Sequence, residues 1–371
     1  MSLVLYRKYR PQKFSEIIGQ EHVVQTLTNA LSLGLISHAY LFAGPRGCGK
    51  TTIARVFAKA INCQNRKSGE SEPCNQCSSC LEIMKGNSID LIEIDAASHR
   101  GIDEIRELRD GIKFVPNKSK YKIFIIDEAH QLTKEAANAL LKTLEEPPAH
   151  AIFILATTEI HKMMPTIISR CQRFDFRKLT VNEIIKRLEL ILEKEKGKIE
   201  REALELIAFQ ASGSIRDAES LLDQALSFAG EKKEIKVEDL KNLLGLVEIN
   251  LISQFSDLLF KKKSLEAINF LNEISEKGYD LQQFAKTLIN YLRQALILKI
   301  IANENYHLTN YLIPGLTKEE LEKMNNQIVS LKLAELEKIV NLFLEAENKM
   351  KYSPILQLPL ELAIIEYCGV V

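Results

Sequence analysis

Two short stretches of this 371-residue chain have residue types that could bind a nucleoside triphosphate. The first, GPRGCGKTT, follows a predicted strand, precedes a predicted helix and matches the Gly-x-x-x-x-Gly-Lys-Thr pattern of a phosphate-binding loop. Glycine lets backbone N–H groups turn toward phosphate oxygens, and the N-terminus of the following helix favours an anion. The predicted phosphate-binding residues are Gly44, Pro45, Arg46, Gly47, Cys48, Gly49, Lys50, Thr51 and Thr52.

The second stretch, IFIIDEAH, places two carboxylates directly after an apolar strand. In a parallel sheet this is the edge where ligands bind. We expect Lys50 to reach the outer phosphates, and Thr51 and Asp127 to hold Mg²⁺. Glu128 is placed to orient and polarise a water molecule that attacks the terminal phosphate. The two stretches together predict an ATP site with catalytic residues.

Three further residues could respond to a terminal phosphate. Thr158 ends the apolar run AIFILATT, Arg216 begins a predicted helix, and Arg170 lies in a loop before the last predicted strand. Each also has an ordinary interpretation, since threonine is common at strand ends and arginine is usually solvated on a surface.

Cysteines form a second chemical group close to the phosphate loop. Cys63, Cys74, Cys77 and Cys80 have the spacing C-x10-C-x2-C-x2-C, which can fold around one tetrahedral Zn²⁺ ion. Disulfides are the first alternative and unligated core cysteines the second, but the intervening residues are polar. Four thiolates leave no open position for water, so the predicted zinc module, residues 63–80, is structural and stabilised by its metal. Cys48, Cys171 and Cys368 lie outside this spacing.

The elements that position these residues change character along the chain. Near-continuous apolar runs at 39–44, 89–95, 122–127, 151–158 and 173–176 alternate with helical patterns, as in a parallel sheet covered on both faces. From residue 179 the pattern is helical, with Thr180 and Glu183 at capping-box spacing. We predict a nucleotide-binding α/β domain at 1–178, a small helical domain at 179–245 and an all-helical domain at 246–371.

Composition excludes several classes of protein. The chain is 46% apolar with a formal net charge of zero, which indicates a globular protein without a broad basic field to attract nucleic acid. Its apolar runs are too short to cross a membrane, and its first residues do not form a signal peptide. We therefore expect a cytoplasmic location and no membrane partner.

Several motifs together resemble the gamma/tau family of bacterial DNA polymerase III subunits, the AAA+ ATPases of the sliding-clamp loader. The resemblance is dense over residues 4–226 and weaker beyond them. Its main segments are YRPQKFSEIIGQEHV, HAYLFAGPRGCGKTTIAR, LIEIDAAS, IIDEAHQLTKEAANALLKTLEEPP, FILATTE, ISRCQRF and GSIRDAESLLDQA. It implies an AAA+ P-loop ATPase core, a three-helix lid and a helical collar that joins subunits.

The resemblance also implies roles for particular residues. Arg170 would be an arginine finger that completes a neighbouring subunit's site, Arg216 the sensor of the lid and Thr158 the sensor at the strand end. Zinc is implied at the four cysteines, and the adenine base is implied near the Arg-Pro pair at Ile17, Ile18 and Gly19. DNA contacts are implied at Arg100, Arg106 and Lys142, although Gly101 stands where relatives often have lysine.

The expected function is therefore that of an ATP-driven motor that loads a sliding clamp onto primed DNA within the polymerase III holoenzyme. Implied partners are the delta and delta-prime subunits, further gamma/tau copies, the beta clamp, primer-template DNA and, in longer forms, the polymerase core at the nucleoid-associated replisome. A silent delta-prime-type subunit is one alternative, disfavoured by the intact Lys50, Thr51, Asp127 and Glu128. A Holliday-junction translocase would not be expected to carry the cysteines. A zinc-containing scaffold that binds ATP with little hydrolysis is the third alternative.

Overall fold

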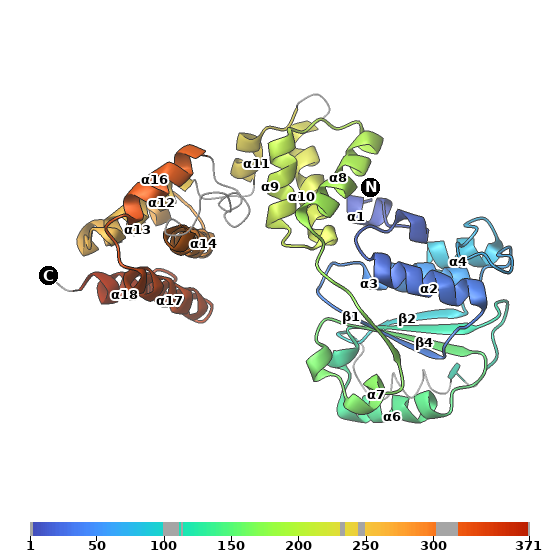
Figure 1. Ribbon diagram of the computed structural model, residues 1–371. Coiled ribbons are helices and arrows are strands. Elements are labelled where there is room, and N and C mark those ends of the chain that lie inside the picture. The colour runs from blue at the N-terminus through green and yellow to red at the C-terminus, as the bar shows by residue number, and fades with distance from the viewer. Residues whose placement is uncertain are drawn as a thin grey trace. The chain divides into compact units, whose positions relative to one another are not determined.

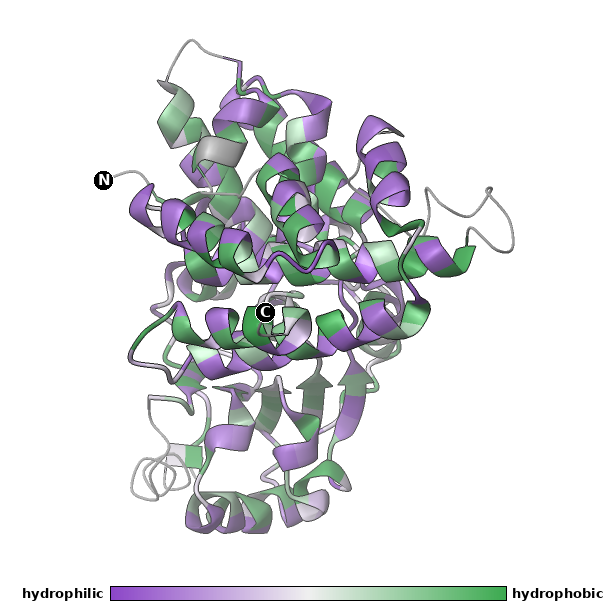
Figure 2. Ribbon diagram, turned by 90° about the vertical axis from the view of Figure 1, so that its left-hand side faces the viewer, coloured by the Kyte–Doolittle hydropathy of each residue, from purple (hydrophilic) through white to green (hydrophobic). Residues whose placement is uncertain are grey.

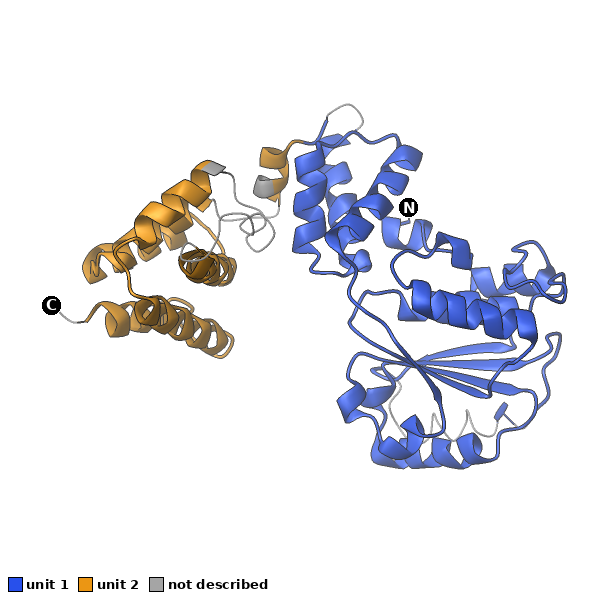
Figure 3. Cartoon of the chain, in the orientation of Figure 1, with its two compact units in different colours: residues 1–235 blue, residues 236–371 orange. Residues whose placement is uncertain are grey.

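The protein is described by a computed structural model, which covers residues 3–98, 111–112, 114–230, 234–243, 249–301 and 318–369. These residues form two compact units, 1–235 and 236–371 (Figure 3). The predicted nucleotide-binding domain and most of the predicted small helical domain thus belong to one unit. The functional residues predicted above all fall in this first unit or outside the described ranges.

A five-stranded parallel sheet is the centre of the first unit, as predicted. Its order is β2 (Leu91–Asp95), β3 (Lys122–Asp127), β4 (Ala151–Thr157), β1 (Ala39–Ala43) and β5 (Gln172–Asp175). Every residue of β1 and β4 is buried, which explains why these strands are apolar throughout instead of alternating. Helices α2 (Glu21–Leu33), α3 (Lys50–Ile61) and α4 (Ser78–Lys85) cover one face, and α6 (Lys134–Glu145) and α7 (Pro165–Ile168) cover the other (Figure 1).

The register of the sheet places the phosphate loop. Gly44 N donates to Thr157 O at 3.1 Å directly beyond the β1–β4 pairing, so the loop leaves the sheet at the carboxyl ends of its central strands. Aromatic side chains pack on both faces below this edge, with Tyr40 4.8 Å from Phe57 and Phe124 5.3 Å from Phe153 between ring centroids. This packing gives the loop a rigid support.

Three helices follow the sheet: α8 (Val181–Glu195), α9 (Arg201–Gln210) and α10 (Ile215–Ala229). The predicted capping box is present at α8, where Thr180 and Glu183 each bond the other's backbone N–H. Ser214 caps α10 by accepting from Asp217 N at 3.3 Å. The short N-terminal helix α1 (Leu5–Lys8) packs against α10, and Leu5 N donates to Asp223 Oδ2 at 3.4 Å.

The second unit is helical throughout its described residues. It contains α11 (Val237–Leu243), α12 (Ile249–Phe260), α13 (Ser264–Glu276), α14 (Leu281–Ile301), α16 (Lys318–Ile328), α17 (Leu333–Met350) and α18 (Leu358–Cys368). Helix α11, which the sequence analysis placed in the preceding domain, groups with this unit. Its core is built around Phe255, Phe284 and Phe343, and hydrophobic and hydrophilic residues interleave along the helices (Figure 2). Among the described residues, no helix is long and apolar enough to span a membrane.

The predicted α/β fold is confirmed by this arrangement. A parallel sheet covered by helices on both faces is followed by a small group of helices, α8 to α10, which we call the lid, and by an all-helical carboxyl-terminal unit.

Candidate functional site

The phosphate loop has a shape that requires glycine. Gly47 has φ of 74°, and a Cβ atom added there would lie 1.9 Å from Ser214 Oγ. Gly44 has φ of 153°, and its added Cβ would lie 2.4 Å from the Phe176 carbonyl oxygen. Both positions therefore exclude a side chain. The lid closes on the loop at this point, because Ile215 N donates to Gly47 O at 3.0 Å.

Lys50 and Thr51 begin helix α3 inside the loop. Lys50 is 6% exposed, and its Nζ donates to Gly44 O and to Pro45 O, both at 2.8 Å. Thr51 Oγ1 donates to Asp127 Oδ2 at 2.7 Å, so the predicted magnesium ligands from two distant segments are direct partners. A buried ammonium held only by carbonyl oxygens is well suited to a phosphate anion. Cys48 turns away and bonds the Pro45 carbonyl through its thiol at 2.9 Å.

Glu128 has a strained backbone beside these residues. Its φ of 48° is left-handed, which is uncommon for a residue other than glycine and is often found at functional sites. Thr158 Oγ1 donates to Glu128 Oε2 at 2.8 Å, and Thr158 N donates to the same oxygen at 3.3 Å. The predicted water-orienting carboxylate and the predicted strand-end sensor therefore form one hydrogen-bonded pair. His130, which the sequence analysis missed, stands beside them and contacts Thr157 Oγ1 at 3.0 Å through Nδ1.

The rest of the pocket comes from the N-terminal segment and the lid. Ile17, Ile18, Arg10, Pro11 and Leu179 line it next to the loop. Gly19 does not line the pocket; it packs behind it, where an added Cβ would lie 3.1 Å from the Glu183 carboxylate. The apolar residues supply a surface for a flat base, and the loop supplies donors for phosphates.

Gln20 joins the pocket's separate segments and was not identified from sequence. Its buried side chain donates to Arg177 O at 2.8 Å and to Cys48 O at 3.4 Å, and it accepts from Arg177 N at 3.3 Å. The N-terminal segment, the phosphate loop and the start of the lid are thus tied together by one amide. A single glutamine in a polar stretch has no spacing that would reveal this role.

Arg216 projects from the first turn of α10 into the same pocket, as predicted. Its guanidinium carbon lies 4.9 Å from the centroid of the Tyr6 ring, and bonding by Arg216 lowers the pKa of Tyr6. The exposed arginine is thereby oriented by an aromatic ring that precedes the loop by many residues.

A buried ion pair fastens the lid beneath Arg216. Arg187 Nε lies 2.8 Å from Glu219 Oε1, and Arg187 also bonds the Tyr9 carbonyl. Burial raises the pKa of Glu219, and the arginine opposes this effect. The lid, the N-terminal segment and the loop are therefore joined by direct contacts.

Arg170 lies elsewhere. It precedes β5 by two residues, and Gln172 of β5 is level with Tyr40, four residues before Gly44. The strand rise over these four residues separates Gln172 from the level of the loop by about 13 Å along the sheet, and Arg170 lies in the turn before Gln172. Its guanidinium instead binds Glu145 Oε1 at 2.7 Å and the Thr166 carbonyl at 2.8 Å. Of the six predicted catalytic residues, four line the pocket and Thr158 bonds one of them, Glu128, whereas Arg170 does neither.

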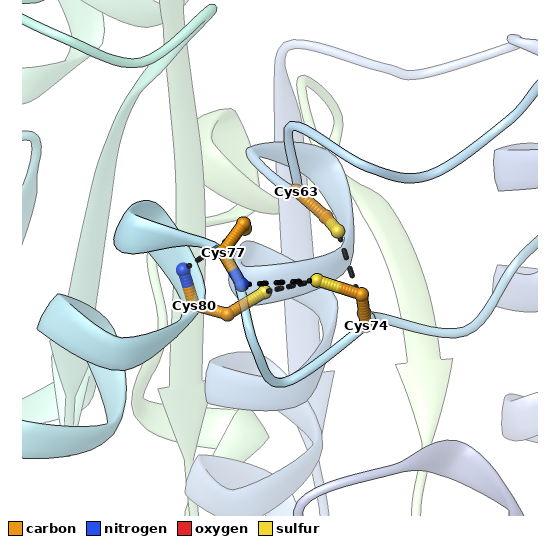
Figure 4. A group of neighbouring side chains, drawn as sticks. All are labelled: Cys63, Cys74, Cys77 and Cys80. Atoms are coloured by element: carbon orange, nitrogen blue, oxygen red, sulfur yellow. Dashed lines mark hydrogen bonds between the residues drawn. The ribbon is translucent and has the colours of Figure 1, made fainter.

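The four predicted zinc ligands converge at the end of α3 and the start of α4 (Figure 4). Their sulfur atoms all lie within 4.8 Å of one another, close to the separation of ligands around one tetrahedral Zn²⁺ ion. All four cysteines are free, so the disulfide alternative is not the one that the structure shows. The residues present fit a metal.

Backbone donors favour a thiolate in this cluster. Cys74 Sγ accepts from Cys77 N at 3.3 Å and from Gln76 N at 3.4 Å. Although partial burial opposes them, these bonds lower the pKa of Cys74 to about 6. Glu72 anchors the segment to the N-terminal 3-10 turn, Phe14–Glu16, by accepting from Phe14 N at 2.9 Å and Ser15 N at 2.8 Å.

Of the predicted DNA contacts, only Lys142 can be placed. It is exposed on α6. Arg100 and Arg106 lie outside the described residues.

Three protein families match consecutive parts of the chain. Residues 19–180 match the family described as "DNA polymerase III, delta subunit". Residues 183–231 match "DNA polymerase III clamp loader subunit, ATPase lid domain", and residues 235–371 match "DNA polymerase III subunits gamma and tau domain III".

Individual relatives extend these matches over nearly the whole chain. DNA polymerase III subunit tau of Bacillus subtilis is 44% identical over 98% of this chain and 63% of its own length. DNA polymerase III subunit gamma of Buchnera aphidicola (strain APS) is 38% identical over 98% of this chain and 97% of its own length. DNA polymerase III subunit tau of Escherichia coli K12 is 40% identical over 80% of this chain and 46% of its own length. The chain thus spans almost all of a gamma-type relative and about half to two thirds of the tau-type relatives.

Proposed function

Since the chain belongs to the gamma and tau family of DNA polymerase III subunits, we propose that it is the ATPase of a sliding-clamp loader and that its site is completed by a neighbouring subunit. ATP binding between subunits would hold a ring able to open the beta clamp and grip primer-template DNA. Hydrolysis would then loosen the ring and leave the clamp on the duplex.

The loop, the two carboxylates and the lid arginine each have a part in this proposed reaction. The loop N–H groups and Lys50 bind the phosphates, and the apolar side chains of Ile17 and Ile18 pack against the base. Thr51 and Asp127 would hold Mg²⁺, which neutralises phosphate charge when bound. Glu128 would orient the attacking water once its carboxylate leaves the Thr158 hydroxyl and turns toward the substrate. Arg216 couples the phosphate to the lid.

One observation carries the proposal: the predicted finger is at the far end of the sheet from its own phosphate loop. A guanidinium so placed can reach only the pocket of another subunit. Such an arrangement is head to tail, and it builds rings. ATP turnover would then depend on assembly, which is what a loader requires.

The four cysteines have a structural part in the proposal. They would hold Zn²⁺, with no free coordination position for substrate, and the metal would stabilise a polar segment that cannot form its own core. The proposed partners are the delta and delta-prime subunits, other gamma/tau copies, the beta clamp and primed DNA, in the cytoplasm. Lys142, Arg100 and Arg106 are proposed DNA contacts, and the carboxyl-terminal unit is the proposed collar.

The test is the substitution Arg170→Ala in the full chain, assayed with the other loader subunits, the clamp and primed DNA. We expect nucleotide affinity to be unchanged and DNA-stimulated turnover to fall about 1,000-fold or more, the usual contribution of an arginine finger. Arg173→Ala is the matched control, because Arg173 follows closely and pairs only with Asp175 of its own strand among the described residues. Loss of nucleotide binding in Arg170→Ala would contradict a role in trans. If the wild-type protein binds ATP but shows no turnover in the full assembly, the result would favour the alternative of an ATP-binding scaffold.

A further inference from the structure

A second cleft, of about 660 Å³, lies beside the nucleotide pocket along helix α3 and the edge strand β2. It shares Tyr6, Arg10, Pro11 and Arg216 with the pocket and continues toward α4. Six cationic side chains line it, against the single carboxylate of Glu93: Arg7, Arg10, Arg55, Lys59, Lys85 and Arg216. We call these residues the cationic cleft.

The charge of the cationic cleft is largely uncompensated. Arg55 binds Glu93, with Nη2 2.7 Å from Oε1. Among the described residues, none of the other five cations has a carboxylate within 4.0 Å, and Lys59 finds only the neutral Gln12 side chain at 2.7 Å. Burial and the nearby Arg55 lower the pKa of Arg10. A protein that keeps like charges together at such a cost is suited to an anionic partner.

An anionic segment of matching character lies beside Arg170. Helix α6 ends at Glu145, and both Glu145 and Glu146 are exposed. Glu145 holds the guanidinium of Arg170 at 2.7 Å. Any subunit that delivers Arg170 to a pocket therefore brings Glu145 close to that pocket, with Glu146 next to it in the chain, and the cationic cleft adjoins the pocket through Arg10 and Arg216.

We propose that the cationic cleft is the docking surface for the carboxyl end of α6 from a second copy of this chain. The inference rests on the proposed function and adds a step to it. On docking, Glu145 exchanges Arg170 for the cations of the cleft, and the Arg170 guanidinium becomes available to the nucleotide. Until then Glu145 keeps the finger neutralised, so an isolated subunit carries a finger already occupied by its own carboxylate.

A charge exchange tests the docking surface directly. The variant Arg7→Glu/Lys85→Glu reverses two cleft residues that lie outside the nucleotide pocket, and Glu145→Lys/Glu146→Lys reverses the end of α6. Each should lower DNA-stimulated turnover in the assembled loader by about tenfold or more while leaving ATP affinity unchanged. The chain that carries all four changes restores opposite charges at every interface between two copies of this chain and should recover most of the activity.

Two further measurements separate the possible outcomes. Carbodiimide crosslinking of mixed isotope-labelled and unlabelled chains should join Lys85 of one chain to Glu145 or Glu146 of another, and ATP should increase the yield. Lys186→Glu, which reverses an exposed charge on α8, is the control and should have no effect.

Turnover that is lost in the cleft variant and not recovered by the fourfold change would overturn the proposal. So would a loss confined to DNA affinity, which would make the cleft a site for phosphate backbone. In both cases the Arg170→Ala result would still decide the proposed function.

Discussion

The cysteine cluster draws its four sulfur atoms from residues 63–80, whereas the nucleotide pocket is lined by residues as far apart as Tyr6 and Glu219. The first site is closed, because its four sulfur atoms come from one short segment and are enough to complete a tetrahedral metal site. The second is open, because its ammonium and guanidinium groups face a space that a phosphate would fill, and its predicted finger lies elsewhere. A local site can be complete within one chain, while a site made of distant segments can be shared between chains.

The largest effect should come from the phosphate loop itself. We expect Lys50→Ala to weaken ATP binding at least about 100-fold, because a buried charge-assisted contact to phosphate disappears. Equilibrium binding of a fluorescent ATP analogue measures this change, and turnover should vanish with it. Lys186→Ala removes an exposed lysine from α8 and serves as the control. Retention of tight binding by Lys50→Ala would show that the pocket depends less on this cation than its burial suggests.

The local site should fail without disturbing the distributed one. Cys77→Ser is expected to weaken zinc binding at least about 100-fold and to increase hydrogen exchange throughout residues 63–80, because metal binding stabilises this segment. ATP affinity should change by less than about threefold, since no residue of the segment lines the pocket and, among the described residues, Glu72 bonds only Phe14 and Ser15, which lie outside the pocket lining. Metal analysis and exchange mass spectrometry are the measurements.

Cys171→Ser offers a matched control for the cysteine substitution, because Cys171 lies outside the cluster. Its zinc content should equal that of the wild type. A Cys77→Ser protein that keeps a full complement of zinc would contradict the view that the four cysteines together form one metal site.

The smallest effect concerns the hinge that joins the pocket to the lid. Arg177 binds the carboxylate of Glu183 at 2.6 Å, and with the Thr180 N–H it lowers the pKa of Glu183 to about 2. We expect Glu183→Gln to reduce the free energy of unfolding by about 1 kcal/mol at pH 7. Because the folded pKa is below the unfolded one, this contribution is complete above pH 4.5 and is lost as the pH falls toward 2.

Urea unfolding of the wild type and of Glu183→Gln between pH 2 and 7 measures the difference in their free energies of unfolding. It should narrow steadily below pH 4.5, and Glu189→Gln, which removes an exposed pair with Arg201, should have a much smaller effect. A difference that does not change with pH would mean that the cap, and not the charge, supports the hinge.

Much of this molecule follows from local patterns. Continuous apolar runs predicted the five parallel strands to within two residues at their ends, because burial on both faces removes polar positions from a strand. Thr180 and Glu183 predicted the start of α8 through a bond that spans three residues. The convergence of the cysteines also followed from spacing, since short loops between ligands allow few geometries.

Other features could not be read from the chain. Gln20, Tyr6 and His130 have ordinary sequence surroundings and acquire their roles from partners more than twenty residues away. Helix α11 has a periodicity that fits either neighbour, so only packing could assign it to the second unit.

The order of the residues specifies which chemical groups are present and which of them are neighbours along a strand, a turn or a helix, because bond geometry and the hydrogen-bond period set those distances. Three features arise from folding alone: Thr158 bonds Glu128, Gln20 ties three segments together, and Arg170 lies far from its own phosphate loop. Such features depend on how the sheet orders its strands and where the lid packs, and these are properties of the whole folded unit.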